Sequence, residues 1–170
     1  MSIISKTALI LGTAVIAAYG VGQFTAASIL TVIEIQAPPE AVWAELTSTE
    51  NYTDWNPFIT QMSGELIEGQ RLGATLQLEG KVPMKIAPKV LVASENRELR
   101  WLGRTGFRGI FDGEHYFVLE ESEQGTTVLQ HGEDFSGMLT HIVFALVGQA
   151  TEEGFQAMNQ ALKHRVETKL

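Results

Sequence analysis

Apolar residues recur at three- and four-residue steps along the last part of the chain, from Ser136 to Lys169. This period predicts one long helix with a broad apolar stripe, about 45 Å long at about 1.5 Å per residue. The stripe consists of Leu139, Ile142, Val143, Leu146, Val147, Ala150, Phe155, Met158, Leu162 and Val166. Because an apolar stripe of this length must be covered, we expect the strand-like segments before it to pack against it.

Those segments alternate apolar and polar residues and are separated by turn residues, as antiparallel strands do. The first strand is expected over 28–36, and two short helices follow it, with Pro39 and Glu40 suited to a first helical turn. The remaining strands are expected over 59–66, 71–79, 84–95 with an interruption at Pro88, 97–103, 110–121 and 126–135.

This order of elements predicts an α+β fold. We expect a helix-grip arrangement, in which one curved antiparallel sheet of about six to seven strands wraps around the C-terminal helix. A cavity between the sheet and the helix follows from that expectation. The predicted domains are an N-terminal apolar helix over 1–27 and a ligand-binding domain over 28–170.

The N-terminal segment contains no charged residue from Thr7 to Gly22. With its flanks up to Ala27 it reaches about 20 residues, which is enough to cross a bilayer as a helix. We expect a single-pass membrane anchor over residues 7–27. A cleaved signal peptide and a buried helix of the domain are the alternatives. Lys6 before the segment and the glutamates after it place the domain on the non-cytoplasmic side.

Composition narrows the classes of partner. The net charge of −8 and the absence of a basic cluster argue against nucleic acid. The chain has no cysteine, which excludes disulfides, thiol catalysis and cysteine-ligated zinc. No cofactor motif is visible, because residues 103–106 lack the lysine and following helix of a phosphate-binding loop.

Three stretches together resemble a known superfamily. They are the segment 35–43 (I-Q-A-P-P-E-A-V-W), the segment 55–58 (W-N-P-F), and the segment 111–119 (F-D-G-E-H-Y-F-V-L) before the long helix. The chain is similar over about 28–169 to the START-like or Bet v 1-like helix-grip proteins (SRPBCC), in particular to the polyketide cyclase/dehydrase branch. That resemblance implies an apolar cavity between sheet and helix. The superfamily includes lipid carriers, cyclases and co-chaperones, so the reaction is left open.

Alternation also predicts which side chains share a face of the sheet. If the apolar-rich parity faces the helix, His115, His131 and Glu133 lie inside together. A histidine beside a carboxylate in an apolar pocket can act as an acid–base pair, because both burial and charge move its pKa. These three residues are the candidates for catalysis. They can equally orient a ligand, or merely satisfy one another's hydrogen-bonding groups. Two histidines with one carboxylate only weakly resemble a zinc site, so no metal is expected.

The candidate ligand-binding cavity includes these residues and the apolar residues of the same faces. Its members are Trp55, Phe58, Trp101, Phe111, His115, Phe117, Leu119, Leu129, His131, Glu133, Phe135, Leu139, Val143 and Val147. The three aromatic residues Trp55, Phe58 and Trp101 can alternatively be plain core. His141 and His164 are expected at the surface. Arg104 and Arg108 either cap an anionic head group at the mouth of the cavity or are simply solvated.

Three functional hypotheses follow. The first is a membrane-tethered binding module, not an enzyme, that holds a small hydrophobic ligand such as a lipid, an isoprenoid or a polyketide-like molecule. The second is a polyketide cyclase or dehydratase that uses the histidine–glutamate group. The third is a co-chaperone-like module that binds another protein.

Overall fold

The structure is a computed structural model, and it describes residues 26–169. The described chain begins with one strand and three short helical segments: β1 (Ala26–Ile35), α2 (Pro39–Thr47), the 3-10 turn η1 (Thr49–Asn51) and α3 (Tyr52–Trp55). Seven strands and a long helix follow: β2 (Ile59–Ser63), β3 (Gly73–Leu76), β4 (Met84–Ile86), β5 (Lys89–Ser94), β6 (Glu98–Thr105), β7 (Phe111–Glu121), β8 (Thr127–Ser136) and α4 (Thr140–Lys169). This is the expected α+β order.

The strands form two antiparallel sheets in this part of the chain. The larger sheet has the order β1-β8-β7-β6-β5, and the smaller has the order β2-β3-β4. The prediction of one sheet with six to seven strands was therefore wrong. Pro88 separates β4 from β5, because it has no N–H to donate to a neighbouring strand. Its carbonyl accepts a hydrogen bond from the N–H of Leu72 at 2.9 Å.

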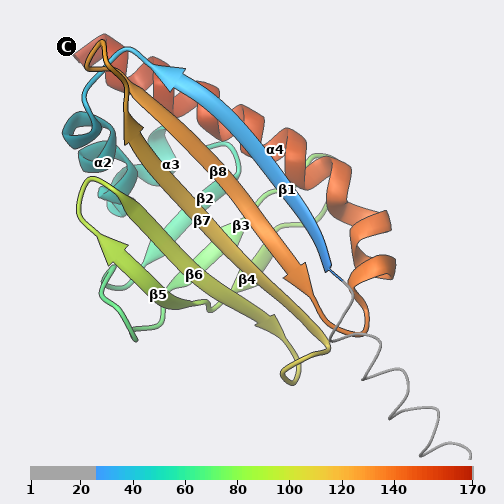
Figure 1. Cartoon of the computed structure of the whole chain (residues 1–170). Helices are drawn as coiled ribbons and strands as arrows, with labels where there is room; N and C mark the ends of the chain where they lie inside the picture. Colours follow the sequence, from blue (N-terminus) through green and yellow to red (C-terminus); the bar gives the residue numbers. More distant parts are fainter. Residues whose placement is uncertain (1–25, 170) are drawn as a thin grey trace, which may run out of the picture.

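The large sheet forms one layer, and α4, α2 and the small sheet all lie on the same side of that layer (Figure 1). Four side chains of α4, namely Phe155, Met158, Leu162 and Val166, are buried in the core with Leu129. The C-terminal half of the predicted stripe is thus covered. Ile142 and Leu146, however, are 62% and 67% exposed, so the expectation that the whole stripe is covered was wrong.

Helix α4 begins at Thr140, four residues later than predicted. Gly137 has a φ of +121°, and a Cβ there would lie 2.7 Å from the carbonyl oxygen of Ile110. Only glycine fits this approach. The N–H groups of Met138 and Leu139 then donate to the carbonyls of Gly109 (2.8 Å) and Ile110 (2.9 Å), which places the start of α4 beside the β6–β7 loop.

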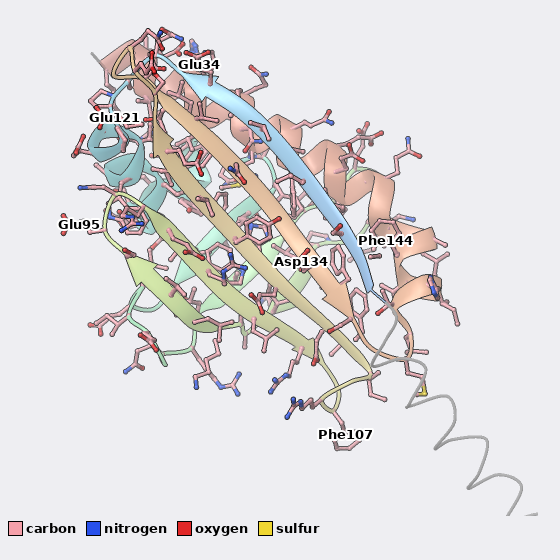
Figure 2. The ribbon with its side chains drawn as sticks, viewed as in Figure 1. Glu34, Glu95, Phe107, Glu121, Asp134 and Phe144 are labelled. Atoms are coloured by element: carbon pink, nitrogen blue, oxygen red, sulfur yellow. The ribbon has the colours of Figure 1, made fainter. Side chains whose placement is uncertain are left out.

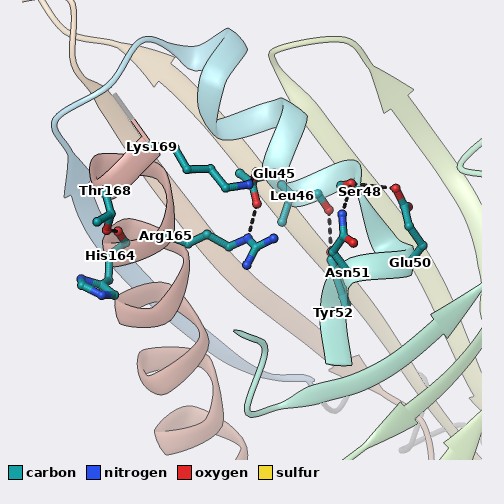
Figure 3. Close-up of polar contacts among 10 residues, drawn as sticks. All are labelled: Glu45, Leu46, Ser48, Glu50, Asn51, Tyr52, His164, Arg165, Thr168 and Lys169. Carbon is teal, nitrogen blue, oxygen red and sulfur yellow. Dashed lines mark hydrogen bonds and ion pairs between the residues drawn. The ribbon is translucent and has the colours of Figure 1, made fainter. Parts of the chain in front are cut away.

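The other end of α4 is tied to α2 through Glu45 (Figure 3). Glu45 accepts hydrogen bonds from Arg165 and from Lys169, both on α4. Burial alone would raise the pKa of Glu45, but the hydrogen bonds and charges of Lys169 and Arg165 together hold it below its usual value. In the segment that follows α2, the hydroxyl of Tyr52 donates to the carbonyl of Leu46 at 2.6 Å.

The predicted membrane anchor falls almost entirely outside the described residues, although Ala26 and Ala27 already belong to β1. Within residues 26–169, no helix combines the length and the apolar character that crossing a bilayer requires.

Candidate functional site

Strand register brings the candidate acid–base residues together on the face of the large sheet that packs against α4. His115 of β7 is paired with Glu133 of β8, and Phe117 is paired with His131. Because side chains alternate, His115, His131 and Glu133 share the inward face, as the alternation predicted. His115 and His131 are buried, and the Glu133 side chain is 18% exposed.

These side chains join a chain of hydrogen bonds with Asn159 of α4 and Thr31 of β1. We call Glu133, His115, His131, Asn159 and Thr31 the buried polar array. Glu133 Oε2 lies 3.4 Å from His115 Nδ1, and the two histidine Nε2 atoms are 3.0 Å apart. His131 Nδ1 lies 2.8 Å from Asn159 Oδ1, and Asn159 Nδ2 donates to Thr31 Oγ1 at 2.9 Å.

Each hydrogen bond of the array has a defined donor and acceptor, and the bonds of Thr31 determine which is which. The Thr31 hydroxyl donates to the carbonyl of His131 at 2.9 Å, so it accepts from the Asn159 amide. Asn159 Oδ1 then faces His131 Nδ1, which must donate. A neutral His131 consequently accepts at Nε2.

Because a neutral imidazole has one donor nitrogen and one acceptor nitrogen, the same argument extends through His115 to the Glu133 carboxyl. His115 must donate from Nε2 to His131, which leaves Nδ1 of a neutral His115 as an acceptor facing Glu133. A carboxylate offers no proton to that acceptor, whereas a carboxylic acid does. The hydrogen-bond pattern therefore favours a protonated Glu133.

Electrostatics agree with this pattern. Burial lowers the pKa of His115 to about 3. Burial and the neighbouring His115 lower the pKa of His131 well below its usual value, although the hydrogen bond to Asn159 opposes this. Burial, with a contribution from the charge of Asp134, raises the pKa of Glu133 to about 8. At neutral pH the array thus consists of two neutral histidines and a carboxylic acid.

Aromatic rings enclose the two histidines. The Trp101 ring stacks on His115 with centroids 4.7 Å apart, and the Phe155 ring stacks on His131 at 4.0 Å. The Phe117 ring lies beside both, with its centroid 5.0 Å from that of His115 and 4.3 Å from that of His131. His131 can consequently act only through its neighbours, and Glu133 is the member with an exposed portion.

Gly113 makes the room for the Glu133 carboxyl. A Cβ at position 113 would lie 2.2 Å from Glu133 Oε1. Around this carboxyl the inward face is less tightly closed than it is near His131. Phe135, on the same face of β8, stacks on the half-buried Phe111 at 5.5 Å and lies 5.7 Å from the half-buried Phe144. Figure 2 shows Phe144 on the first half of α4, near the β8 strand that carries Asp134.

The remaining candidate cavity residues divide into core and periphery. Phe58 is buried, with its ring 5.3 Å from that of Phe155, and Leu119 and Leu129 are also core. Trp55 is half-buried, and its indole N–H has no hydrogen-bond partner in the described structure. Val143 is half-buried, whereas Leu139 is exposed just before α4. His141 and His164 are exposed, as predicted.

Sequence reasoning missed Thr31 and Asn159. Both carried a signal, because each is a polar residue at an apolar position of its pattern. Thr31 shares the parity of Ile29 and Ile33, and Asn159 lies four residues after Phe155 on the buried stripe. A polar residue on a buried face needs a partner, and these two supply one another and His131.

Four pockets lie on the surface of residues 26–169, and none of the four includes His115, His131 or Glu133. One of them, between β1 and α4, is lined in part by Thr31 and Asn159 of the array. Among the same residues, no group of three or more carboxylate or histidine side chains is arranged to hold a metal ion. The two histidines are therefore packed in the interior, whereas the Glu133 side chain is partly exposed and the Thr31–Asn159 end of the array borders a surface pocket.

Comparisons with known proteins identify the class. The family model described as "Polyketide cyclase / dehydrase and lipid transport" matches residues 26–169. The chain therefore belongs to this family, within the START-like helix-grip (SRPBCC) superfamily whose members bind hydrophobic ligands. No curated protein matches the sequence significantly.

Solved structures share the fold at low sequence identity. A START superfamily protein from Mycobacterium smegmatis has a TM-score of 0.64 and 19% identity, over 84% of this chain and 99% of that chain. The Zhui aromatase/cyclase from Streptomyces sp. R1128 has a TM-score of 0.68 and 14% identity, over 84% and 94%. A norcoclaurine synthase from Thalictrum flavum has a TM-score of 0.64 and 15% identity, over 86% and 98%.

Proposed function

We propose that this protein binds a small hydrophobic molecule between the large sheet and the first half of α4, and that Glu133 contacts a polar group of that molecule. One observation carries the proposal. Glu133 carries a partly exposed carboxyl on the inward face of β8, the same face as Phe135, whose ring neighbours the half-buried rings of Phe111 and Phe144. Pockets for small ligands combine an apolar wall with a few polar groups that fix orientation.

The state of the carboxyl narrows the ligand. A protonated Glu133 uses its proton toward His115 Nδ1, so that Oε1 is left to accept a hydrogen bond. A neutral acid does not attract an amine, and an acceptor oxygen does not favour a carboxylate. We therefore favour a ligand with a hydroxyl or enol group on an apolar body, such as a sterol-like, isoprenoid or polyketide-like molecule.

The test uses a fluorescent apolar probe, N-phenyl-1-naphthylamine, with the full chain. Val147→Trp should fill the ligand space and weaken probe binding at least tenfold. Ile142→Trp, on an exposed position of the same helix, should leave binding unchanged. Equal binding by both variants would place the probe elsewhere and overturn the proposed site. Native mass spectrometry of the purified protein would identify a retained ligand.

A second candidate is an acid–base enzyme of the cyclase or dehydratase type, and one observation favours it. The partly exposed Glu133, whose pKa is raised by burial to about 8, can donate its proton to a substrate carbonyl, and the carboxylate that results can then act as a base and take a proton back. Glu133→Gln should retain probe binding under this reading but abolish turnover of a polyketone substrate. Turnover that survives the substitution would exclude Glu133 as the base.

We further propose that the domain is attached to a membrane through the segment that precedes β1, from residue 7 onward, and lies on the non-cytoplasmic side. The uncharged run from Thr7 to Gly22 supports this. Alkaline extraction of membranes should leave the full chain in the pellet, and its release into the supernatant would contradict an anchor.

A further inference from the structure

The β6–β7 loop and the adjoining edge of β5 carry a concentration of positive charge. A pocket of about 530 Å³ there is lined by eight residues, four of which are basic and none acidic. The basic residues are Arg71, Lys89, Arg104 and Arg108. The chain as a whole has 20 acidic and 12 basic residues, so this local sign is opposite to the overall charge.

The same loop exposes a large apolar side chain. Phe107, between Arg104 and Arg108 in the chain, is 83% exposed and projects at the lower end of the molecule (Figure 2). We call Arg71, Lys89, Arg104, Phe107 and Arg108 the basic end. Arg104 is partly neutralised, because its Nε lies 3.5 Å from Asp112 Oδ2.

Other apolar surface and the start of the domain adjoin the basic end. The carbonyls of Gly109 and Ile110 accept hydrogen bonds from Met138 and Leu139, just before α4 exposes Ile142 and Leu146. Ala26, the first described residue, is paired with Ser136 immediately before this turn. Residues 1–25, whose only charged side chain is that of Lys6, therefore join the domain at this end.

We propose that the basic end docks onto the surface of an anionic lipid bilayer, with Phe107 inserted at the headgroup level and the basic residues against lipid phosphates. A bilayer combines an anionic surface with an apolar interior, and it is the partner that matches both features. A soluble phosphate would use the charges but would leave Phe107 and the exposed α4 residues without a role.

The absence of cysteine makes a direct test possible. Thr105→Cys in the full chain, labelled with an environment-sensitive fluorophore, reports on the basic end. Gln124→Cys, at the β7–β8 turn, is the control label at the other end of β7. With vesicles that contain phosphatidylserine, the Thr105 label should shift to the blue, whereas the Gln124 label should not. Vesicles of phosphatidylcholine alone should produce a clearly smaller shift at Thr105, because an N-terminal anchor would bring the domain to both vesicle types but only the anionic surface attracts the basic residues.

Variants that remove basic residues test how much these charges contribute to membrane docking. Lys89→Ser with Arg108→Ser should lower the ratio of docked to undocked protein roughly 30-fold, because each basic side chain near an anionic surface contributes about a fivefold factor. Lys81→Ser with Arg97→Ser removes the same charge from exposed positions outside the pocket and should change the ratio little. Equal losses in the two pairs, or equal shifts with both vesicle types, would overturn the proposal.

Competition with inorganic phosphate distinguishes binding of lipid phosphates from binding of soluble phosphate. If phosphate reverses the shift more than sodium chloride does at equal ionic strength, the pocket binds a soluble anion and the membrane proposal fails. None of these results depends on probe binding beside Glu133, so this proposal and the proposed function fail separately.

Discussion

The Nε2 atoms of His115 and His131 lie 3.0 Å apart inside the protein, so one ring must donate to the other. Thr31 and Asn159 decide which, because their hydrogen bonds make His131 the acceptor at Nε2. A threonine and an asparagine outside the predicted site thus determine the protonation of the carboxyl at its other end. This relationship makes the array testable one residue at a time.

The first prediction concerns the tautomers. With ¹⁵N-labelled histidine, His131 should show a proton on Nδ1 and His115 a proton on Nε2, and both should stay neutral well below pH 6. An imidazolium signal from His115 at neutral pH would contradict the assigned direction.

The second prediction removes the residue that orients His131. Asn159→Leu leaves His131 Nδ1 and Thr31 without their partner, so it should lower the free energy of unfolding by about 1–3 kcal/mol. Urea unfolding measures this change, and the His131 tautomer should become mixed. Gln160→Leu, at the exposed neighbouring position, should change stability little. Comparable losses in the two variants would mean that the array contributes nothing specific.

The third prediction is a pH dependence. The folded protein retains the Glu133 proton up to a pKa of about 8, whereas the unfolded chain loses it near the usual value of 4.5. The folded state therefore binds more protons between these values, and its stability falls as the pH rises through this window.

Glu133→Gln should remove that fall, because the amide does not ionise and still donates toward His115 Nδ1. Urea unfolding midpoints measured from pH 5 to 9 should decline less in the variant than in the parent protein. Glu123→Gln, which changes an exposed carboxyl at the β7–β8 turn, is the control. Parallel pH profiles for the parent and Glu133→Gln would show that Glu133 is ionised in the folded protein at neutral pH.

The fourth prediction compares two glycines that face each other across β6 and β7. Gly113→Ala should displace the Glu133 carboxyl from His115, because the new Cβ would lie 2.2 Å from Oε1. At Gly103 the nearest atom to a Cβ is the carbonyl oxygen of Gly113 at 3.8 Å, so Gly103→Ala should be accommodated. The pKa of Glu133, followed by ¹³C-carboxyl NMR, should drop toward its usual value only in Gly113→Ala.

The fifth prediction tests the tie between α2 and α4. Glu45→Gln should lower the free energy of unfolding at neutral pH by about 1 kcal/mol, because two partly exposed ion pairs are lost. The pKa of Glu45 is lowered in the folded state, so its contribution is present above the usual carboxyl pKa and is lost as the pH falls.

The difference between Glu45→Gln and the parent should therefore shrink in acid, as measured by urea unfolding. Glu68→Gln, at an exposed position outside the helices and strands, should change the free energy of unfolding little. A constant difference between Glu45→Gln and the parent across the range would rule out this electrostatic explanation.

Local patterns were sufficient where the structure is itself local. The two-residue period of 111–119 and 127–135 placed His115, His131 and Glu133 on one face, because strand geometry depends only on adjacent residues. The helical period located α4 to within four residues of its start. It did not reveal that Ile142 and Leu146 are exposed. The helical period identifies which side chains share a face of the helix, but not which residues pack against that face.

What the sequence by itself determined was the order of elements, the family resemblance and the inward parity of the candidate acid–base residues. The tertiary structure decided that Asn159 reaches Thr31 across 128 positions of the chain, and that Trp101 and Phe155 close over the histidines. It also decided the direction of the array and hence the proton on Glu133. The physical reason is that hydrogen-bond direction and burial depend on partners brought together by packing, which no local spacing encodes.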